Sequence, residues 1–286
     1  MYRPHEAGDD RGWKLNIQDW IGRSQTTNDV ATRAPLDGLA AMLDRDVSFW
    51  RDGEVPPLAH WLYFLSPAKG LEIGPDGHPK RGGFLPPITL PRRMWAGSRI
   101  EFLRSIPVGA EITDRSEVAD IVEKKGKSGA MVFVTVRREI GCNGVLAIRE
   151  ERDVVYRDEP KSATMHSAPQ PDARKPEWSR SVTPDPVLLF RFSALTFNAH
   201  RIHYDRDYAM KTEGYPGLVV QGPLTAILLM DHYLAKNPRA DVSRFEFRAE
   251  KPLFDGAPFE LCGSGTDLWA RTSSGERAMS AQIDLR

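Results

Sequence analysis

Residues 222–236 read GPLTAILLMDHYLAK, and this stretch limits the folds that the chain can adopt. It begins with Gly-Pro, and proline is favoured at the first position of a helix. Apolar residues occupy nearly every face of the predicted helix, so the helix must be buried on most of its sides. We therefore expect an α+β fold in which a sheet wraps round this helix.

The sequence on both sides of the helix is typical of strands. VLLFRF (187–192) before it predicts one strand. Three or four more follow at hairpin-length spacing, among them LWARTS (268–273) and ERAMSAQIDLR (276–286). One long helix wrapped by an antiparallel sheet is the hot-dog arrangement.

The two halves of the chain share a repeated sequence pattern, which we call the echo. SRIEFLRSIPVGAEI (98–112) repeats Ser, Arg, Glu, Phe and Pro of SRFEFRAEKPLFDGAPFEL (243–261) over its first ten positions. Apolar and charged residues alternate in both, which predicts a strand with one buried face. More strand-like sequence follows in the first half, in SGAMVFVTVRREI (128–140) and VLAIREERDVVY (145–156). We expect a duplication, giving a double hot dog of two antiparallel sheets, each wrapped round a long central helix.

Residues 159–186 separate the halves. They hold six prolines and almost no apolar periodicity. Because proline lacks an N–H donor and fixes φ, this stretch predicts a linker rather than a helix or a central strand. The expected domains are a hot dog over residues 1–158, a linker over 159–186 and a second hot dog over 187–286.

Composition excludes several classes of protein. Lys+Arg and Asp+Glu balance at 39 each, whereas a nucleic-acid-binding protein usually has a basic excess. The longest apolar runs fall far short of the ~20 residues of a membrane span, and MYRPHEAGDDRGW (1–13) lacks the apolar core of a signal peptide. Cys142 and Cys262 are expected to be small buried residues. We expect a cytoplasmic protein without a nucleic-acid or membrane partner.

NAHRIHYD (198–205) concentrates two of the chain's 7 histidines. In one interpretation it is a polar loop, with Asp205 as the N-cap of a short helix in RDYAMKTEG (206–214). In a second, His203, Asp205 and His232 are ligands of a two-His-one-carboxylate iron site. That site normally needs several strands between its ligands, and here a helix intervenes, so we expect no metal.

The third interpretation is proton transfer at a thioester. The N-terminus of the helix that begins at Gly222 offers unpaired N–H groups and a partial positive charge, which suit a carbonyl gaining negative charge. A nearby histidine can move a proton because its pKa is close to working pH. These parts, with a deep apolar slot, are what acyl-thioester chemistry requires.

FRFSALTFNAHRIHYD (190–205) and GYPGLVVQGPLTA (214–226) resemble the hydratase module of MaoC-like enzymes, whose signature runs Asp-x-Asn-Pro-x-His-x-Asp. The branch they are most similar to comprises the 3-methylfumaryl-CoA (mesaconyl-C4-CoA) hydratases and the mitochondrial-type 3-hydroxyacyl-thioester dehydratases. In the first half, WIGRSQTTNDV (20–30), PPLAHWLYFL (56–65) and GGFLPPITLPRRMWAG (82–97) resemble the dehydratase-like N-terminal domain of those hydratases. The resemblance covers nearly the whole chain.

This resemblance implies a lyase that reversibly hydrates an α,β-unsaturated acyl-CoA of the mesaconyl-C4-CoA type, giving a 3-hydroxyacyl-CoA such as citramalyl-CoA. The second half would carry the chemistry, and the first would have lost its own copy. His203 takes the place of the signature's catalytic histidine, Asn198 that of its aspartate, and Gly222 that of the backbone N–H that holds the thioester oxygen. The neighbouring residues expected to bind substrate are Tyr215, Gly217, Gln221, Pro223, His200 and Arg201.

Two departures from the signature affect the mechanism. Asn198 replaces the aspartate, and a carboxamide cannot take a proton, although it can hold a water. His200-Arg201 replaces Asn-Pro, so His203 would move the proton alone or with help from His200. No cofactor is needed, since coenzyme A is the substrate carrier. Whether the chain forms a homodimer of double hot dogs is an open question at this point.

Three rival functions also stay open. They are a 3-hydroxyacyl-ACP or -CoA dehydratase of fatty-acid synthesis, a hot-dog thioesterase and a non-catalytic acyl-CoA-binding module. Arg92, Arg93 and Arg244 are candidates for contacts with coenzyme A phosphates, although solvated charges are the simpler interpretation. His60 is the only first-half histidine inside an apolar segment, and a core role is more common there than a contact with a substrate carboxylate.

Overall fold

The computed structural model describes residues 16–46, 49–51, 53–126, 129–158 and 171–286. Both halves of the chain contribute strands to one antiparallel sheet of ten strands. Those of the first half are β1 (Ser24–Val30), β2 (Arg92–Phe102), β3 (Glu111–Gly126), β4 (Gly129–Cys142) and β5 (Val145–Arg157). Those of the second half are β6 (Trp178–Val182), β7 (Val242–Ala249), β8 (Phe259–Ser264), β9 (Asp267–Arg271) and β10 (Arg277–Leu285).

The two halves arrange their five strands in the same way. The sheet runs β1-β3-β4-β5-β2-β7-β10-β9-β8-β6, so from its outer edge inward each half shows its first, third, fourth, fifth and second strand, and β2 and β7 meet in the middle. These two strands carry the sequence echo, and they pair with Ile100 opposite Phe245, the positions that the echo equates. A pseudo-two-fold axis therefore passes through this pair. The double hot dog is confirmed, with its two sheets joined edge to edge.

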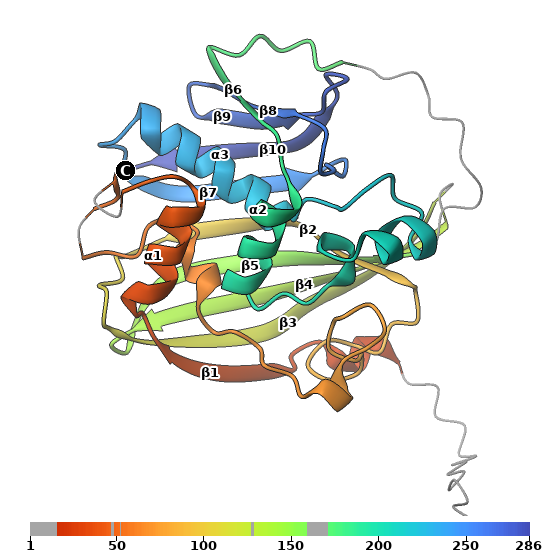
Figure 1. The fold of residues 1–286 in the computed structure, drawn as a ribbon. Helices are drawn as coiled ribbons and strands as arrows, with labels where there is room; N and C mark the ends of the chain where they lie inside the picture. The colour runs from red at the N-terminus through yellow and green to blue at the C-terminus, as the bar shows by residue number, and fades with distance from the viewer. Residues whose placement is uncertain (1–15, 47–48, 52, 127–128, 159–170) are drawn as a thin grey trace, which may run out of the picture.

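Three helices lie across one face of the sheet (Figure 1): α1 (Arg33–Met42), α2 (Pro186–Leu195) and α3 (Gly222–Lys236). Helix α3 has the predicted bounds, and every residue from Leu224 to Tyr233 is buried. Helix α1 has only 10 residues and buries four of them, so the described part of the first half does not contain the long central helix expected for it. The shorter turns are η1 (Ile17–Trp20), η3 (Ala59–Leu62), η4 (Gly70–Glu72), η5 (Arg201–His203) and the π-helical η6 (Tyr208–Thr212).

The prediction of a strand over residues 187–192 was wrong, because these residues form helix α2. Asp185 caps the helix by accepting a hydrogen bond from the Leu188 N–H at 2.7 Å, and Pro186 occupies its first turn. Leu189 and Phe192 are buried three positions apart, which is a helical spacing and not the period of two of a strand.

The segment predicted as a linker contains one short strand. β6 lies at the edge of the sheet, where it pairs only with β8 among the described strands, and residues 159–170 lie outside the described part. An edge position fits a proline-rich neighbourhood, because one side of an edge strand needs no ladder hydrogen bonds. The division at residues 1–158, 159–186 and 187–286 stays a proposal.

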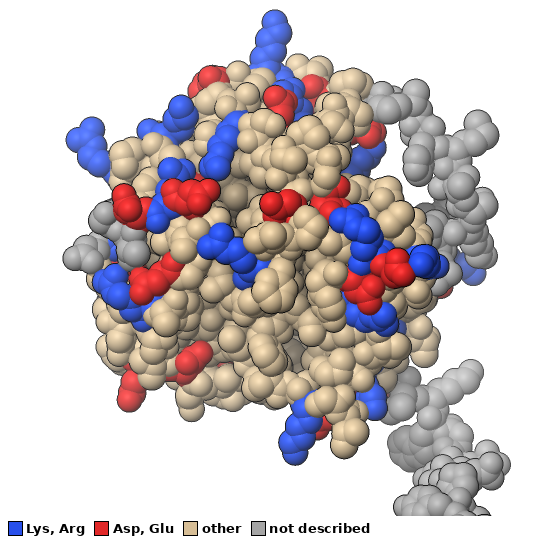
Figure 2. All heavy atoms as spheres, viewed as in Figure 1, with Lys and Arg blue, Asp and Glu red and all other residues tan. Residues whose placement is uncertain are grey.

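Other expectations from composition can be compared with the structure directly. Cys142 and Cys262 are buried free thiols, as predicted. Basic and acidic side chains are interspersed over the face in Figure 2, without a large patch of one sign. Within the described residues, no helix is long and apolar enough to cross a membrane.

Candidate active site

The turn after α2 places the two histidines of the 198–205 segment. Helix α2 ends at Leu195, and Phe197 adopts a left-handed φ of 49° that turns the chain. The side-chain oxygen of Asn198 then accepts a hydrogen bond from the His200 N–H at 3.1 Å. This local bond fixes the start of η5 and leaves the amide nitrogen of Asn198 as the end that can contact a water.

His203 is buried, and one ring nitrogen is fixed by a backbone bond. Its Nδ1 lies 2.7 Å from the carbonyl oxygen of Val219. Because a carbonyl can only accept, Nδ1 carries the proton and Nε2 keeps its lone pair. Burial lowers the pKa of His203 to about 4, against a smaller opposing effect of the Val219 bond. At neutral pH His203 is therefore an uncharged imidazole whose Nε2 can accept a proton.

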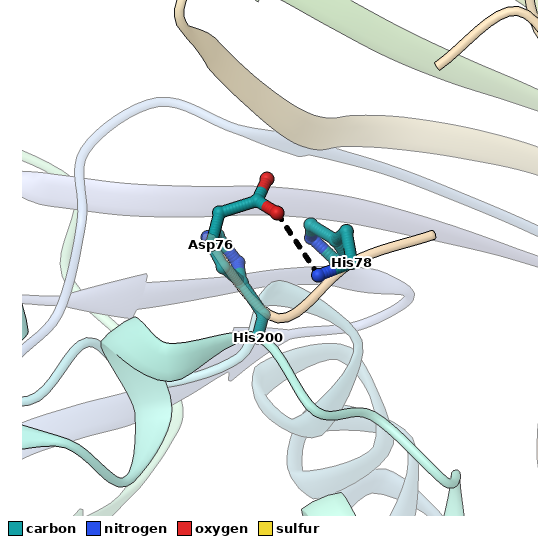
Figure 3. A group of neighbouring side chains, drawn as sticks. All are labelled: Asp76, His78 and His200. Carbon is teal, nitrogen blue, oxygen red and sulfur yellow. Dashed lines mark hydrogen bonds between the residues drawn. The ribbon is translucent and has the colours of Figure 1, made fainter. Parts of the chain in front are cut away.

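His200 lies between His203 and a third histidine that the sequence analysis did not single out. The His200 ring is 5.3 Å from that of His203 and 4.1 Å from that of His78, centroid to centroid. Figure 3 shows His78, Asp76 and His200 facing one another. Burial, with the nearby His203 and Arg93, lowers the pKa of His200 to about 3, and burial also lowers the pKa of His78. We call His78, His200 and His203 the histidine cluster.

A loop of the first half delivers His78 to the second-half site. The Arg201 N–H donates to the carbonyl of Asp76 at 2.9 Å, and the Asp76 side chain accepts from the His78 N–H. Gly77 has a φ of +88°, and a Cβ there would lie 1.8 Å from the carbonyl oxygen of Ala199. Only glycine permits this approach, so a Pro-Asp-Gly turn followed by histidine was the signal in the sequence.

The N-terminus of α3 forms the other side of the candidate site. The Ile202 carbonyl accepts from the Val219 N–H at 2.9 Å, so the chain leading into α3 runs beside His203. Gln221 is buried, donates to Ser193 and to the Leu189 carbonyl, and leaves its Oε1 without a partner. At Gly222, in the first turn of the helix, an added Cβ would lie 3.6 Å from the Trp95 carbonyl. Strand β2 of the first half therefore borders this helix end.

The other residues predicted to bind substrate make contacts within the protein itself. Tyr215 lies under the Arg92 guanidinium, 5.1 Å from its ring centre, and Pro223 occupies the first turn of α3. At Gly217 a Cβ would lie 2.7 Å from a carboxylate oxygen of Asp255, so a larger residue there would displace that side chain. The Arg201 guanidinium is engaged in an ion pair with Asp205 at 2.7 Å. Their roles in substrate binding stay predictions.

Asp205 is the predicted cap, since its Oδ1 accepts from the Tyr208 N–H at 3.0 Å. Among the described residues, the proposed iron ligands His203, Asp205 and His232 do not come together; His232 lies 4.7 Å from the Trp178 ring. The trio with ligand atoms within 4.8 Å of one another is Asp76, His78 and His200. The rings of His78 and His200 are tilted by 34° with their centroids 4.1 Å apart, and the positive charge of Arg93 opposes a cation there.

His60 is a core histidine. Its Nε2 lies 3.4 Å from Glu150, and both side chains are almost completely buried. Burial lowers its pKa despite the carboxylate, so the ring makes a neutral hydrogen bond inside the first half.

A double hot dog with a neutral buried histidine beside the N-terminus of its central helix defines a class, the MaoC-like hydratases and dehydratases. The chain belongs to one family within it, since the model of the family hydroxyacyl-thioester dehydratase type 2 matches residues 58–255. Mesaconyl-C(4)-CoA hydratase of Chloroflexus aurantiacus is 46% identical over 275 residues, which cover 93% of this chain and 96% of that protein. The mitochondrial hydroxyacyl-thioester dehydratase type 2 of Schizosaccharomyces pombe is 28% identical, over 84% of this chain and 90% of that one.

Solved structures agree with the fold. A MaoC-like dehydratase superposes with a TM-score of 0.68 at 18% identity, over 95% of this chain and 99% of that one. HtdX of Mycobacterium tuberculosis superposes with a TM-score of 0.63 at 17% identity, over 91% and 99%. Another protein of that organism, described as a double hot dog, superposes with a TM-score of 0.55 at 15% identity, over 94% and 98%.

Proposed function

We propose that this hydro-lyase adds water to the double bond of an α,β-unsaturated acyl-CoA, with mesaconyl-C4-CoA as the acyl type and citramalyl-CoA as the product. The Chloroflexus relative supports this acyl type, since it is 46% identical over nearly its whole length. The structural observation that carries the proposal is the bond from His203 to the Val219 carbonyl, which leaves Nε2 as a buried base.

His203 acts on the water. Nε2 takes a proton from a water while the water oxygen bonds to the β-carbon of the thioester, and the C=C π electrons move onto the thioester as an enolate. The imidazolium then returns a proton to the α-carbon, so one whole water is added and the histidine ends neutral. The amide nitrogen of Asn198 holds the water in place, because its oxygen is bound to the His200 N–H.

The enolate oxygen needs hydrogen-bond donors where its charge develops. The N–H groups in the first turn of α3, that of Gly222 foremost, have no carbonyl four residues earlier in the helix to bind. Their partial positive charge stabilises an oxyanion, and each such donor contributes on the order of 10²–10³-fold to turnover.

The test is a hydration assay with a panel of CoA thioesters that differ in the acyl group. We expect the purified protein to bleach the enoyl-thioester absorbance of mesaconyl-C4-CoA and to form a 3-hydroxyacyl-CoA. Absence of hydration across the panel, with a correctly folded protein, contradicts the proposal. The same assay distinguishes the alternative functions, because a thioesterase releases free coenzyme A and a fatty-acid dehydratase prefers long unbranched 3-hydroxyacyl chains.

A further inference from the structure

Arg92 and Arg93 are adjacent on β2 but have different surroundings. The Arg92 guanidinium lies over the Tyr215 ring and 3.6 Å from a carboxylate oxygen of Glu213, so its charge is compensated. Arg93, which is partly buried, makes no ion pair with any carboxylate in the described part of the chain. The group facing its guanidinium is the neutral Tyr156 hydroxyl, so no negative charge of the described residues compensates Arg93, which suggests an anionic partner from outside the protein.

Arg93 lies near the histidine cluster, two residues before Trp95, whose carbonyl borders the first turn of α3. Its positive charge contributes to the low pKa of both His78 and His200. Its cross-strand partner is Tyr156 on β5, whose buried hydroxyl faces the Arg93 guanidinium and makes no regular hydrogen bond with another described residue. The neighbouring Arg81 is not equivalent, because its guanidinium already donates to the carbonyls of residues 88, 90 and 91.

Near the histidine cluster, the Arg93 guanidinium and the Tyr156 hydroxyl therefore offer donors that no carboxylate among the described residues binds. Asp76 is the carboxylate within 4.8 Å of the two rings, and its Oδ1 is bound to the His78 N–H. Donors of this kind, around one guanidinium, bind carboxylates.

The proposed reaction places a carboxylate at this point. In a monothioester of a four-carbon unsaturated diacid, the free carboxylate is bonded to the same β-carbon that receives the water oxygen. That water is held at His203, so the carboxylate must lie within two bonds of the hydration point. A group that binds it must therefore sit beside the histidine cluster, as Arg93 does.

We propose that Arg93, assisted by the Tyr156 hydroxyl, binds the free carboxylate of the acyl group and makes the enzyme specific for CoA monothioesters of unsaturated dicarboxylic acids. This inference rests on the proposed function. It assigns Arg93 to the acyl group instead of the coenzyme A phosphates.

The test uses fumaryl-CoA and crotonyl-CoA, which differ only in a carboxylate or a methyl group on the β-carbon. We expect Arg93→Gln to lower kcat/KM for fumaryl-CoA by roughly 30-fold or more, as truncation of a buried charge pair does. Crotonyl-CoA should change by less than about threefold, and Tyr156→Phe should show the same selectivity with a smaller loss. Arg149→Gln is the matched control, because Arg149 lies on β5 in exposed ion pairs with Glu101 and Glu139.

Equal losses with both thioesters would overturn the proposal, since Arg93 would then support the fold or a shared part of the substrate. An unchanged fumaryl-CoA rate would also overturn it. Calorimetric binding of succinyl-CoA and butyryl-CoA, which have no double bond to hydrate, tests the anchor without turnover. If Arg93→Gln weakens only succinyl-CoA, the anchor stands even where hydration is absent, and only the proposed function fails.

Discussion

The polar residues around Glu150 and those around His203 are both buried, yet they are satisfied to different degrees. Glu150, in the interior of the first half, accepts hydrogen bonds from Ser98, Trp61, Arg138 and Arg152. Arg138 also binds Asp114 at 2.7 Å. Although burial opposes it, Arg152 and its neighbours hold the pKa of Glu150 well below its usual range. In this Glu150 network two guanidinium groups compensate two carboxylates, and His60 Nδ1 is left as an atom without a partner.

Around His203 the opposite holds. Gln221 Oε1 is buried without a partner among the described residues, and the tautomer of His203 leaves its Nε2 lone pair available. Buried polar groups that bind one another stabilise a fold, whereas an unsatisfied buried group calls for a further partner. The Glu150 network is thus a satisfied polar core of the first half, whereas the groups around His203 are those for which we propose a substrate as the partner.

The largest expected effect is the loss of His203. We expect His203→Ala to lower turnover by roughly 10²–10⁴-fold, because the variant has no other positioned base. His203→Asn keeps a donor for the Val219 carbonyl and should be equally slow, with a thermal midpoint close to that of the parent. Steady-state hydration of mesaconyl-C4-CoA measures both, and turnover at the parental rate in either variant would end the mechanism.

Removing a charge from the Glu150 network should affect stability and not catalysis. Glu150→Gln leaves the buried Arg138 and the partly buried Arg152 with one carboxylate fewer, at a cost of about 3–5 kcal/mol in the free energy of unfolding. Urea denaturation measures the cost, and kcat/KM per folded molecule should stay within about threefold. A variant that is fully stable but inactive would place this network in the active site.

The histidine cluster predicts acid-sensitive stability. The pKa of His203 is about 4 in the folded protein, below the 6.5 of an exposed histidine, and those of His200 and His78 are lowered too. The unfolded chain therefore takes up protons first as pH falls. This contribution to stability is complete above about pH 6.5 and is lost as pH falls toward 4, by about 1.4 kcal/mol per pH unit for each buried histidine. Denaturation curves at several pH values should show a shallower slope for His78→Asn, and a slope equal to the parent's would contradict the buried neutral state.

A smaller effect is expected at Asn198. An aspartate there can keep the bond to the His200 N–H while adding a negative charge beside the cluster. That charge favours the imidazolium, so the pKa of His203 should rise by roughly one unit and the acidic limb of the pH–rate profile should move up from about 4. An unmoved limb in Asn198→Asp would show that the carboxamide is incidental.

Much of the fold could be predicted from local pattern. The Gly-Pro start and the apolar faces of residues 222–236 predict α3 with its observed bounds, and the echo at Ile100 and Phe245 marks the strands that pair across the axis. The strand predicted over 187–192 was wrong although Asp185-Pro186 signals a helix start, because the apolar run outweighed the spacing of Leu189 and Phe192.

The candidate site was only partly predictable. The positions of His203, Asn198 and Gly222 follow from one continuous segment and its resemblance to a signature. His78 lies 122 residues before His200, and only the approach of Gly77 to Ala199 brings the two together. The difference between Arg92 and Arg93 is likewise invisible in sequence, since it depends on which strand and loop face each side chain.

Isotope labelling distinguishes the addition of water to a thioester-conjugated double bond from hydrolysis of the thioester. The purified protein is incubated with mesaconyl-C4-CoA in ¹⁸O-enriched water, and the products are analysed by mass spectrometry. We expect one ¹⁸O in the acyl group of an intact 3-hydroxyacyl-CoA, and none in a matched reaction with His203→Ala. Release of coenzyme A with the label in a free carboxylic acid would contradict this expectation, because the site would then attack the thioester carbonyl and not the β-carbon.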